Sequence, residues 1–109
     1  MEGQATPTVS APPKSALLPN YPNPFNPETW IPFQIAEGTT VHITIYGPAG
    51  QIVRTLELGS LPAGTYTTRS KAAYWDGTND AGERVASGPY FYRIEAGSYS
   101  AMRRMVILK

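Results

Sequence analysis

The sequence contains no cysteine among its 109 residues. This absence excludes disulfide bonds, metal sites built from thiolates and a cysteine nucleophile. Charged residues make up only 16% of the chain and the formal net charge is +1, so there is no electrostatic reason to expect binding to nucleic acid or to an anionic membrane. No apolar run approaches the roughly 20 residues of a membrane-spanning helix, and the first residues lack the basic and apolar regions of a signal peptide.

Stretches that could form long helices are also lacking, because proline and glycine punctuate the whole chain. Most of the 11 prolines fall within the first 32 residues, whereas nine of the 10 glycines come after residue 37. Proline fixes φ and removes a backbone donor, and glycines that recur at short intervals mark turns. We therefore expect many short extended elements and exclude a helix bundle, a coiled coil or a long crossover α/β fold.

The composition changes near residue 16. Residues 1–16 are rich in proline, serine, threonine and alanine and hold little that could be buried, so we predict a flexible linker there. Residues 17–109 carry nearly all the large apolar side chains and fit one domain. From a linker at this position we expect the domain to be attached, in its parent chain, to a cargo domain that precedes it.

Alternation of apolar and polar residues predicts the strands. It is clearest over residues 41–46, where Val41, Ile43 and Ile45 are expected to point inward, and it returns over 89–96 and 99–108. Further strands are expected over 29–35 with an interruption at Pro32, over 51–58, over 65–75 with a break near Ala72, and as a minor strand over 83–85. About seven strands with frequent turns predict an all-β, immunoglobulin-like antiparallel β-sandwich.

Nothing in the sequence forms a catalytic constellation. The one histidine, His42, falls on the polar side of a predicted strand, and neither a G-x-S-x-G motif nor a phosphate-binding loop is present. The carboxylates are scattered over different elements. We therefore expect no enzymatic activity and no cofactor.

One polar loop is the best candidate for a metal. Calcium prefers several oxygen ligands from a single loop, and this loop supplies the side chains of Asp76, Asn79, Asp80 and Glu83. Their spacing is not that of an EF-hand. The alternative is that these side chains form Asx turns with their own backbone.

Aromatic and basic residues leave two further interpretations open. Aromatic residues make up 11% of the chain, and an exposed row of rings would suit a carbohydrate-binding module, although alternation near Tyr90 and Tyr92 favours core packing. The basic end consists of Arg103, Arg104 and Lys109. Such cations either prevent edge-to-edge pairing of sheets or dock a partner.

Several blocks of the sequence resemble known families. The run LPNYPNPFNPET over 18–29, together with blocks at 41–46, 50–56, 88–94 and 103–109, resembles the C-terminal sorting domains of the type IX secretion system. Its most specific part is the proline–asparagine motif, made of Asn20, Pro22, Asn23, Pro24, Phe25, Asn26 and Pro27. The blocks at 54–56, 75–77, 79–82 and 86–88 are similar to the immunoglobulin-like domain of the flagellar hook-capping protein.

The first resemblance implies a non-catalytic C-terminal secretion signal and surface-attachment module of a protein that is secreted, or held at the bacterial cell surface, after passing through the periplasm. Its partners would be the outer-membrane export machinery and a sortase-like peptidase that cuts within residues 1–18. The resemblance also implies a recognition surface formed by Gly88, Pro89, Tyr90, Phe91, Tyr92, Arg103, Arg104 and Lys109. The alternatives are a hook-cap-like assembly domain, with weak self-association left open, and a carbohydrate-binding module of a secreted enzyme.

Overall fold

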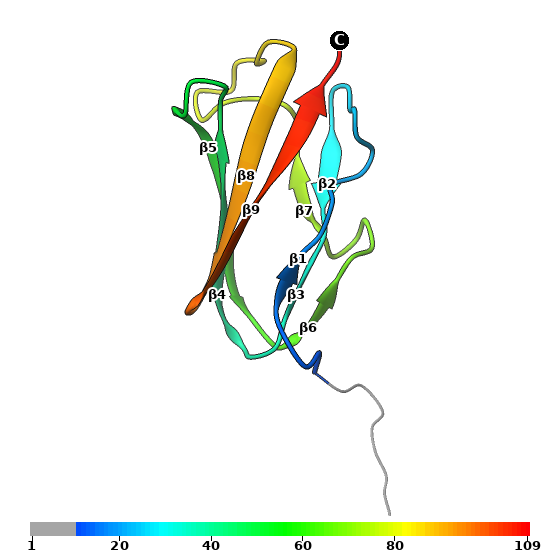
Figure 1. Ribbon diagram of the computed structural model, residues 1–109, viewed down its shortest axis with the longest axis vertical. Coiled ribbons are helices and arrows are strands. Elements are labelled where there is room, and N and C mark those ends of the chain that lie inside the picture. Colours follow the sequence, from blue (N-terminus) through cyan, green and yellow to red (C-terminus); the bar gives the residue numbers. More distant parts are fainter. Residues whose placement is uncertain (1–10) are drawn as a thin grey trace, which may run out of the picture.

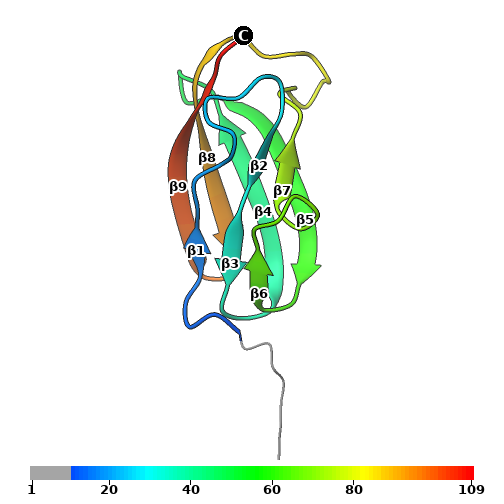
Figure 2. The same cartoon turned by 90° about the vertical axis from the view of Figure 1, so that its right-hand side faces the viewer.

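Two layers of antiparallel strands are seen in the computed structural model, which describes residues 11–109 (Figures 1 and 2). One layer is a four-stranded sheet with the order β5 (Ile52–Leu61), β4 (Thr39–Tyr46), β8 (Gly88–Ala96) and β9 (Tyr99–Ile107). No helix occurs within residues 11–109, and so none there could cross a membrane. The predicted all-β, immunoglobulin-like sandwich is confirmed.

The facing layer is built from shorter strands, which lie in front in Figure 2. It contains a three-stranded sheet of β1 (Ala16–Leu17), β3 (Phe33–Ile35) and β6 (Gly64–Tyr66), and a pair formed by β2 (Thr29–Ile31) and β7 (Ala73–Trp75). Pro32 separates β2 from β3, because it has no N–H to continue a ladder. Its carbonyl oxygen accepts a hydrogen bond from Leu18 N at 3.1 Å. The predicted interruption at Pro32 is thus confirmed.

The core lies between the two layers and follows the predicted alternation. Val41, Ile43 and Ile45 of β4 are fully buried, and β8 and β9 continue the same inner surface. The other large side chains with no more than 2% exposure are Phe25, Ile31, Phe33, Ile35, Trp75, Tyr92, Ile94, Met105 and Ile107. Burial of these apolar surfaces supplies the main driving force for folding.

Two predicted segments differ from the structure. Residues 65–75 form two short strands separated by a turn in which Thr68 O accepts hydrogen bonds from Lys71 N and Ala72 N, so the break is wider than expected. The predicted minor strand over 83–85 is wrong, since only an isolated bridge between Thr78 and Arg84 forms there. Asn79 holds the backbone of Glu83 in a tight loop instead of a ladder.

Contacts with the sandwich begin before the predicted boundary at residues 16 and 17. Lys14 O accepts a hydrogen bond from Gln34 Nε2 at 3.0 Å, and Ser15 Oγ accepts one from Ala36 N at 3.0 Å. Ala16 is already in β1. Most of the predicted linker, residues 1–10, lies outside the described residues.

Candidate functional site

The proline–asparagine motif runs along the outer edge of β9, and we call residues 17–28 the strap. Phe25 N donates to Val106 O at 3.0 Å, and Leu108 N donates to Phe25 O at 3.0 Å. Asn23 Oδ1 accepts a third hydrogen bond from Val106 N at 3.0 Å. The Phe25 ring is buried and meets Trp75 edge-on at 5.6 Å. The strap therefore satisfies backbone groups at the end of β9 that would otherwise form an open sheet edge.

A buried polar network anchors the start of the strap. The Tyr92 hydroxyl donates to Leu18 O at 2.8 Å and accepts from Asn20 N at 2.9 Å. Asn20 Nδ2 donates to Thr29 Oγ1 at 3.0 Å. Burial raises the pKa of Tyr92, which keeps the phenol neutral and able to donate. Asn20 and Phe25 thus serve the fold, because a partner cannot reach either side chain.

The remaining motif residues turn the chain at the surface. Pro22, Pro24 and Pro27 each follow a cis peptide bond and are exposed, as are Asn23 and Asn26. Gly77 lies directly against this segment with φ +81°, and a Cβ at that position would come within 2.5 Å of Pro27 O. Only glycine fits this close approach, so the Trp75–Gly77 block and the proline–asparagine motif are mutually adapted.

The predicted recognition residues fall into buried and exposed groups. Tyr90 and Tyr92 are 4% and 0% exposed, and β8 is paired on both sides, by β4 and β9. Their hydroxyls bond internally, Tyr90 to Ala86 O at 2.8 Å. These two side chains belong to the core and cannot contact a partner. Phe91 alternates with them and points to the outer side of the sheet.

The two adjacent arginines lie on opposite sides of β9. Arg103 Nε donates to Leu17 O at 2.8 Å, so Arg103 closes the flank between β9 and β1. Arg104 pairs in register with Phe91 on the outer side, and no carboxylate among residues 11–109 lies within ion-pair distance of it. Lys109 is exposed, and its backbone N donates to Ser87 Oγ at 3.1 Å. Arg104 and Lys109 thus remain available for a partner, whereas the exposed Arg103 side chain is engaged with Leu17 O.

Exposed apolar side chains gather on the outer side of the four-stranded sheet. We define the docking face as Tyr46, Ile52, Phe91, Met102, Arg104 and Leu108. The register places Ile52, Tyr46, Phe91 and Arg104 side by side across all four strands. Ile52, Met102 and Leu108 are 63%, 52% and 62% exposed, and they are three of the four exposed large hydrophobic residues in the described chain. Such a concentration on one face is typical of an interaction surface.

The opposite end of the same face is polar and internally paired. His42 Nε2 lies 2.7 Å from Glu95 Oε1, and Arg93 Nε lies 3.3 Å from Glu95 Oε2. These side chains line a shallow hollow of about 500 Å³. The histidine contacts a carboxylate, with no hydroxyl nucleophile bonded to it. The absence of enzymatic activity stays a prediction.

Arg54 ties the loop over residues 76–83 to β5. Its Nη1 donates to Thr78 Oγ1 at 2.8 Å and lies 3.4 Å from Asp76 Oδ1. The hydrogen bond from Thr78 Oγ1, at 2.6 Å, lowers the pKa of Asp76 despite an opposing effect of burial. On the other side of the loop, Asp80 Oδ1 accepts from Thr55 N at 3.2 Å.

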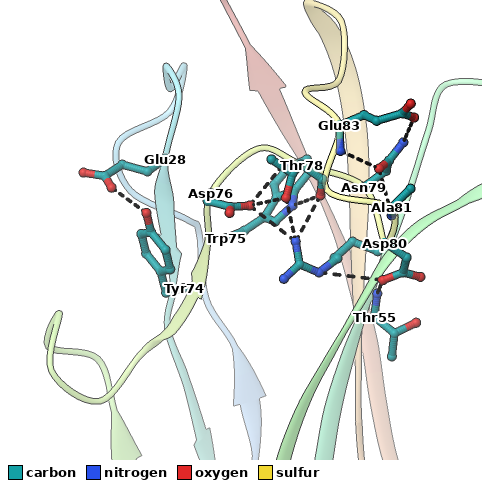
Figure 3. Close-up of polar contacts among 11 residues, drawn as sticks. Glu28, Thr55, Tyr74, Trp75, Asp76, Thr78, Asn79, Asp80, Ala81 and Glu83 are labelled. Carbon is teal, nitrogen blue, oxygen red and sulfur yellow. Dashed lines mark hydrogen bonds and ion pairs between the residues drawn. The ribbon is translucent and has the colours of Figure 1, made fainter.

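The oxygens proposed as calcium ligands accept hydrogen bonds from the protein itself. Asn79 Oδ1 accepts from Ala81 N and Glu83 N, at 3.0 and 2.9 Å, and Glu83 Oε1 accepts from Asn79 Nδ2 at 3.1 Å (Figure 3). These are Asx-type contacts. Within residues 11–109, no three acidic or histidine side chains group closely enough to hold a metal ion. Calcium binding therefore stays a prediction without support from this geometry.

The sequence blocks that contain Arg54 and this loop are the ones that resemble the immunoglobulin-like domain of the hook-capping protein. A comparison with family models supports the same relationship. The family model described as FlgD Ig-like domain matches residues 32–100. The chain belongs to the FlgD Ig-like domain family. The match spans the Arg54–Asp76 network, whereas the strap up to Glu28 and most of β9 lie outside it.

Solved structures share the fold of this FlgD Ig-like domain. Dimeric latent PorU from Porphyromonas gingivalis has a TM-score of 0.63 at 18% identity, over 86% of this chain and 9% of PorU. PorZ, an essential bacterial surface component of the type IX secretion system of the same organism, has a TM-score of 0.57 at 19% identity, over 86% of this chain and 12% of PorZ. FlgD from P. aeruginosa has a TM-score of 0.55 at 15% identity, over 90% of this chain and 69% of FlgD.

These similarities concern the fold alone. The chain spans only about a tenth of the length of PorU and PorZ. A search of proteins with curated functions gave no match.

Three aromatic rings lie close together on the β2–β7 pair of this FlgD-like domain and on the strap next to it. The ring centroids of Tyr21 and Trp30 are 6.3 Å apart, and those of Trp30 and Tyr74 are 5.5 Å apart. The Arg69 guanidinium lies 4.2 Å over the Trp30 ring, a cation–π contact. It covers a ring face on which a sugar would stack. Carbohydrate binding stays a prediction.

Two features of the site were not predicted from the sequence. The opposite directions of Arg103 and Arg104 could have been predicted, because alternation along a strand sends neighbours to opposite faces. The pairing between the strap and β9 could not, because a loop without a hydrophobic period does not indicate which segment it contacts.

Proposed function

We propose that this domain is a non-catalytic module that directs an attached protein out of the cell, or holds it at the bacterial surface, through recognition by type IX secretion machinery. Membership of the FlgD Ig-like family and the fold shared with a surface component of that system support the proposal. So does the resemblance of the proline–asparagine motif to type IX sorting domains.

The docking face is the observation that carries the proposal. The fold of a single domain does not require Ile52, Met102 and Leu108 to be exposed on the same side of the sheet as Arg104. Apolar side chains around an arginine are the composition of interface centres that bind partners strongly. β8 and β9 contribute Phe91, Met102 and Arg104 to the face, and the family resemblance assigns Phe91 and Arg104 to recognition.

The strap gives this surface a defined shape. It fixes the end of β9 through the hydrogen bonds of Phe25 with Val106 and Leu108, so the face is pre-organised before a receptor arrives. Pre-organisation lowers the entropy cost of binding. A peptidase that acts on an extended chain would cut before Lys14, because Lys14 and the residues after it are bonded to β3 and its following turn.

An export assay tests the proposal. The domain is fused behind a secreted reporter in a bacterium that has a type IX system, and surface or medium reporter is measured. The double variant Met102→Asp/Arg104→Glu is expected to lower export roughly tenfold, since it inverts the chemistry of the part of the face that lies on β9. Arg84→Glu changes the same charge on an exposed loop and serves as the control. Normal export of the double variant, with its fold verified by circular dichroism, would contradict the proposal.

A hook-cap-like assembly role is the second candidate. The observation in its favour is that the family model and FlgD from P. aeruginosa cover most of the domain. An assembly domain has to associate with copies of itself or with filament subunits. Light scattering over a range of protein concentrations would show such self-association as a rising mass, and a constant monomer mass would favour the sorting role.

A further inference from the structure

One flank of the sandwich is open, at the end of β5 opposite to Ile52. β5 is the edge strand of the four-stranded sheet and β6 is an edge of the facing sheet, and both lie on the same side in Figure 2. The turn at Pro62 connects them. Between them is a groove of about 440 Å³ that is lined by Leu58, Leu61, Pro62, Tyr66, Ser70 and Lys71.

The outer edge of β5 is covered over only half of its length. Near its start, Asp80 N donates to Val53 O at 3.0 Å, and Thr55 N donates to Asp80 Oδ1 at 3.2 Å. No hydrogen bond from any of residues 11–109 reaches the outer edge beyond Glu57. No atom lies within 4 Å of where a Gly59 Cβ would stand. A segment of backbone from Glu57 to Leu61 is therefore accessible to an incoming strand.

The groove beside this edge is apolar and has a cationic rim. Leu58, Leu61 and Tyr66 are half-buried, and the Tyr66 ring is fixed from below by stacking on Phe33 at 5.0 Å. Lys71 is exposed at the rim, with no carboxylate of residues 11–109 within ion-pair distance. The surface thus offers backbone hydrogen bonds, a place for apolar side chains and a positive charge next to them.

We propose that this groove binds an extended segment of a partner protein by β-strand addition. The segment pairs with residues 57–61, places apolar side chains at alternate positions on Leu58, Leu61 and Tyr66, and presents a carboxylate to Lys71. Main-chain hydrogen bonds give affinity in this mode and the alternate side chains give specificity. A positive φ of +76° at Gly59 and the register shift opposite it form a bulge, which limits the pairing to a short segment. The inference does not depend on the proposed export function.

A blocked hexapeptide, acetyl-Thr-Val-Thr-Val-Thr-Glu-amide, is the probe, because it places both valines and the glutamate on one face of an extended strand. It is titrated into the isotope-labelled domain while amide signals are followed by NMR. Binding is expected to shift signals of residues 57–61 and of Tyr66. Two N-methylated versions, each blocking a different alternate set of amides, provide the control. Only the set that faces β5 should weaken binding, by roughly 30-fold, because strand pairing uses every second amide.

A charge exchange tests the rim. Lys71→Glu is expected to weaken binding of the glutamate peptide about 2- to 5-fold and to strengthen binding of a lysine version by a similar factor, as for an exposed ion pair.

Three results would overturn the proposal: absence of binding at roughly 1 mM peptide, shifts confined to the docking face, or equal weakening of binding by both N-methylated peptides. If the same amide signals shifted when the protein concentration was raised without peptide, and the mass in solution doubled, the occupant of the groove would be a second copy of the chain and not a partner protein.

Discussion

Phe25 and Ile107 form a parallel bridge that joins the strap to the last strand. The bridge uses both backbone groups of Phe25, which bond to Val106 O and Leu108 N at 3.0 Å each. The Phe25 ring enters the same core as Ile107 and is 2% exposed. The strap and the last strand therefore stabilise each other, and loss of either is expected to destabilise both.

Substitution of Phe25 tests this coupling. Phe25→Ala leaves a cavity against Trp75 and is expected to cost about 3–5 kcal/mol of unfolding free energy, while Phe25→Leu should cost about 1–2 kcal/mol. Urea denaturation followed by tryptophan fluorescence measures both. Asn26→Ala changes an exposed neighbour and serves as the control. Equal stability of Phe25→Ala and the control would contradict a structural role for the motif.

Tyr92→Phe removes one hydroxyl from the network at the start of the strap. Leu18 O loses its donor and Asn20 N its acceptor, and we expect a loss of about 1–3 kcal/mol. Because burial raises the folded pKa of Tyr92 above its ordinary 10.0, the contribution of the phenol is complete below that value and is lost as pH rises through the folded pKa. Denaturation curves at neutral and alkaline pH should therefore converge for wild type and variant.

The strands were predictable because their side chains alternate. Val41, Ile43 and Ile45 are buried as expected, and the hairpin turn from Gly47 to Gly50 is closed by the hydrogen bond from Gly50 N to Gly47 O at 2.9 Å. Local rules of this kind depend only on neighbouring residues. The break at Pro32 follows from a missing N–H, which is likewise a local property.

The site was less predictable because it depends on contacts between distant segments. The family resemblance assigns Tyr90 and Tyr92 to recognition, whereas their alternation favours the core, and the structure places both side chains in the core. Arg54, Asp76 and Asp80 come from two elements that only the fold brings together. Residue type identified the two aspartates as candidates, whereas their contacts with Arg54 required the three-dimensional structure.

Asp76 should give the domain a characteristic acid sensitivity. The hydrogen bond from Thr78 lowers the folded pKa of Asp76 below its ordinary 3.8, so its contribution is complete above that value and is lost as pH falls through the folded pKa. Asp76→Asn lacks this contribution. The difference in stability between wild type and variant, from denaturation at about pH 6 and about pH 2, is expected to shrink at the lower pH. Glu57→Gln removes an equal charge from an exposed strand position, and a similar pH dependence for it would contradict the assignment.

Arg103 and Arg104 provide a matched pair that separates stability from recognition. Arg103→Ala removes the donor to Leu17 O, a bond of 2.8 Å, and is expected to cost about 1 kcal/mol. Arg104→Ala removes an exposed side chain without an ion pair in residues 11–109, so its effect on stability should be within about 0.5 kcal/mol.

Export should follow the opposite order, because only Arg104 lies on the docking face. Arg104→Ala is expected to lower reporter export severalfold, whereas Arg103→Ala should export in proportion to its folded fraction. Denaturation midpoints and the export assay on the same two variants give the comparison. If both arginines changed export equally after correction for stability, the outward direction of Arg104 would have no role in recognition, and the receptor would have to contact another surface of the domain.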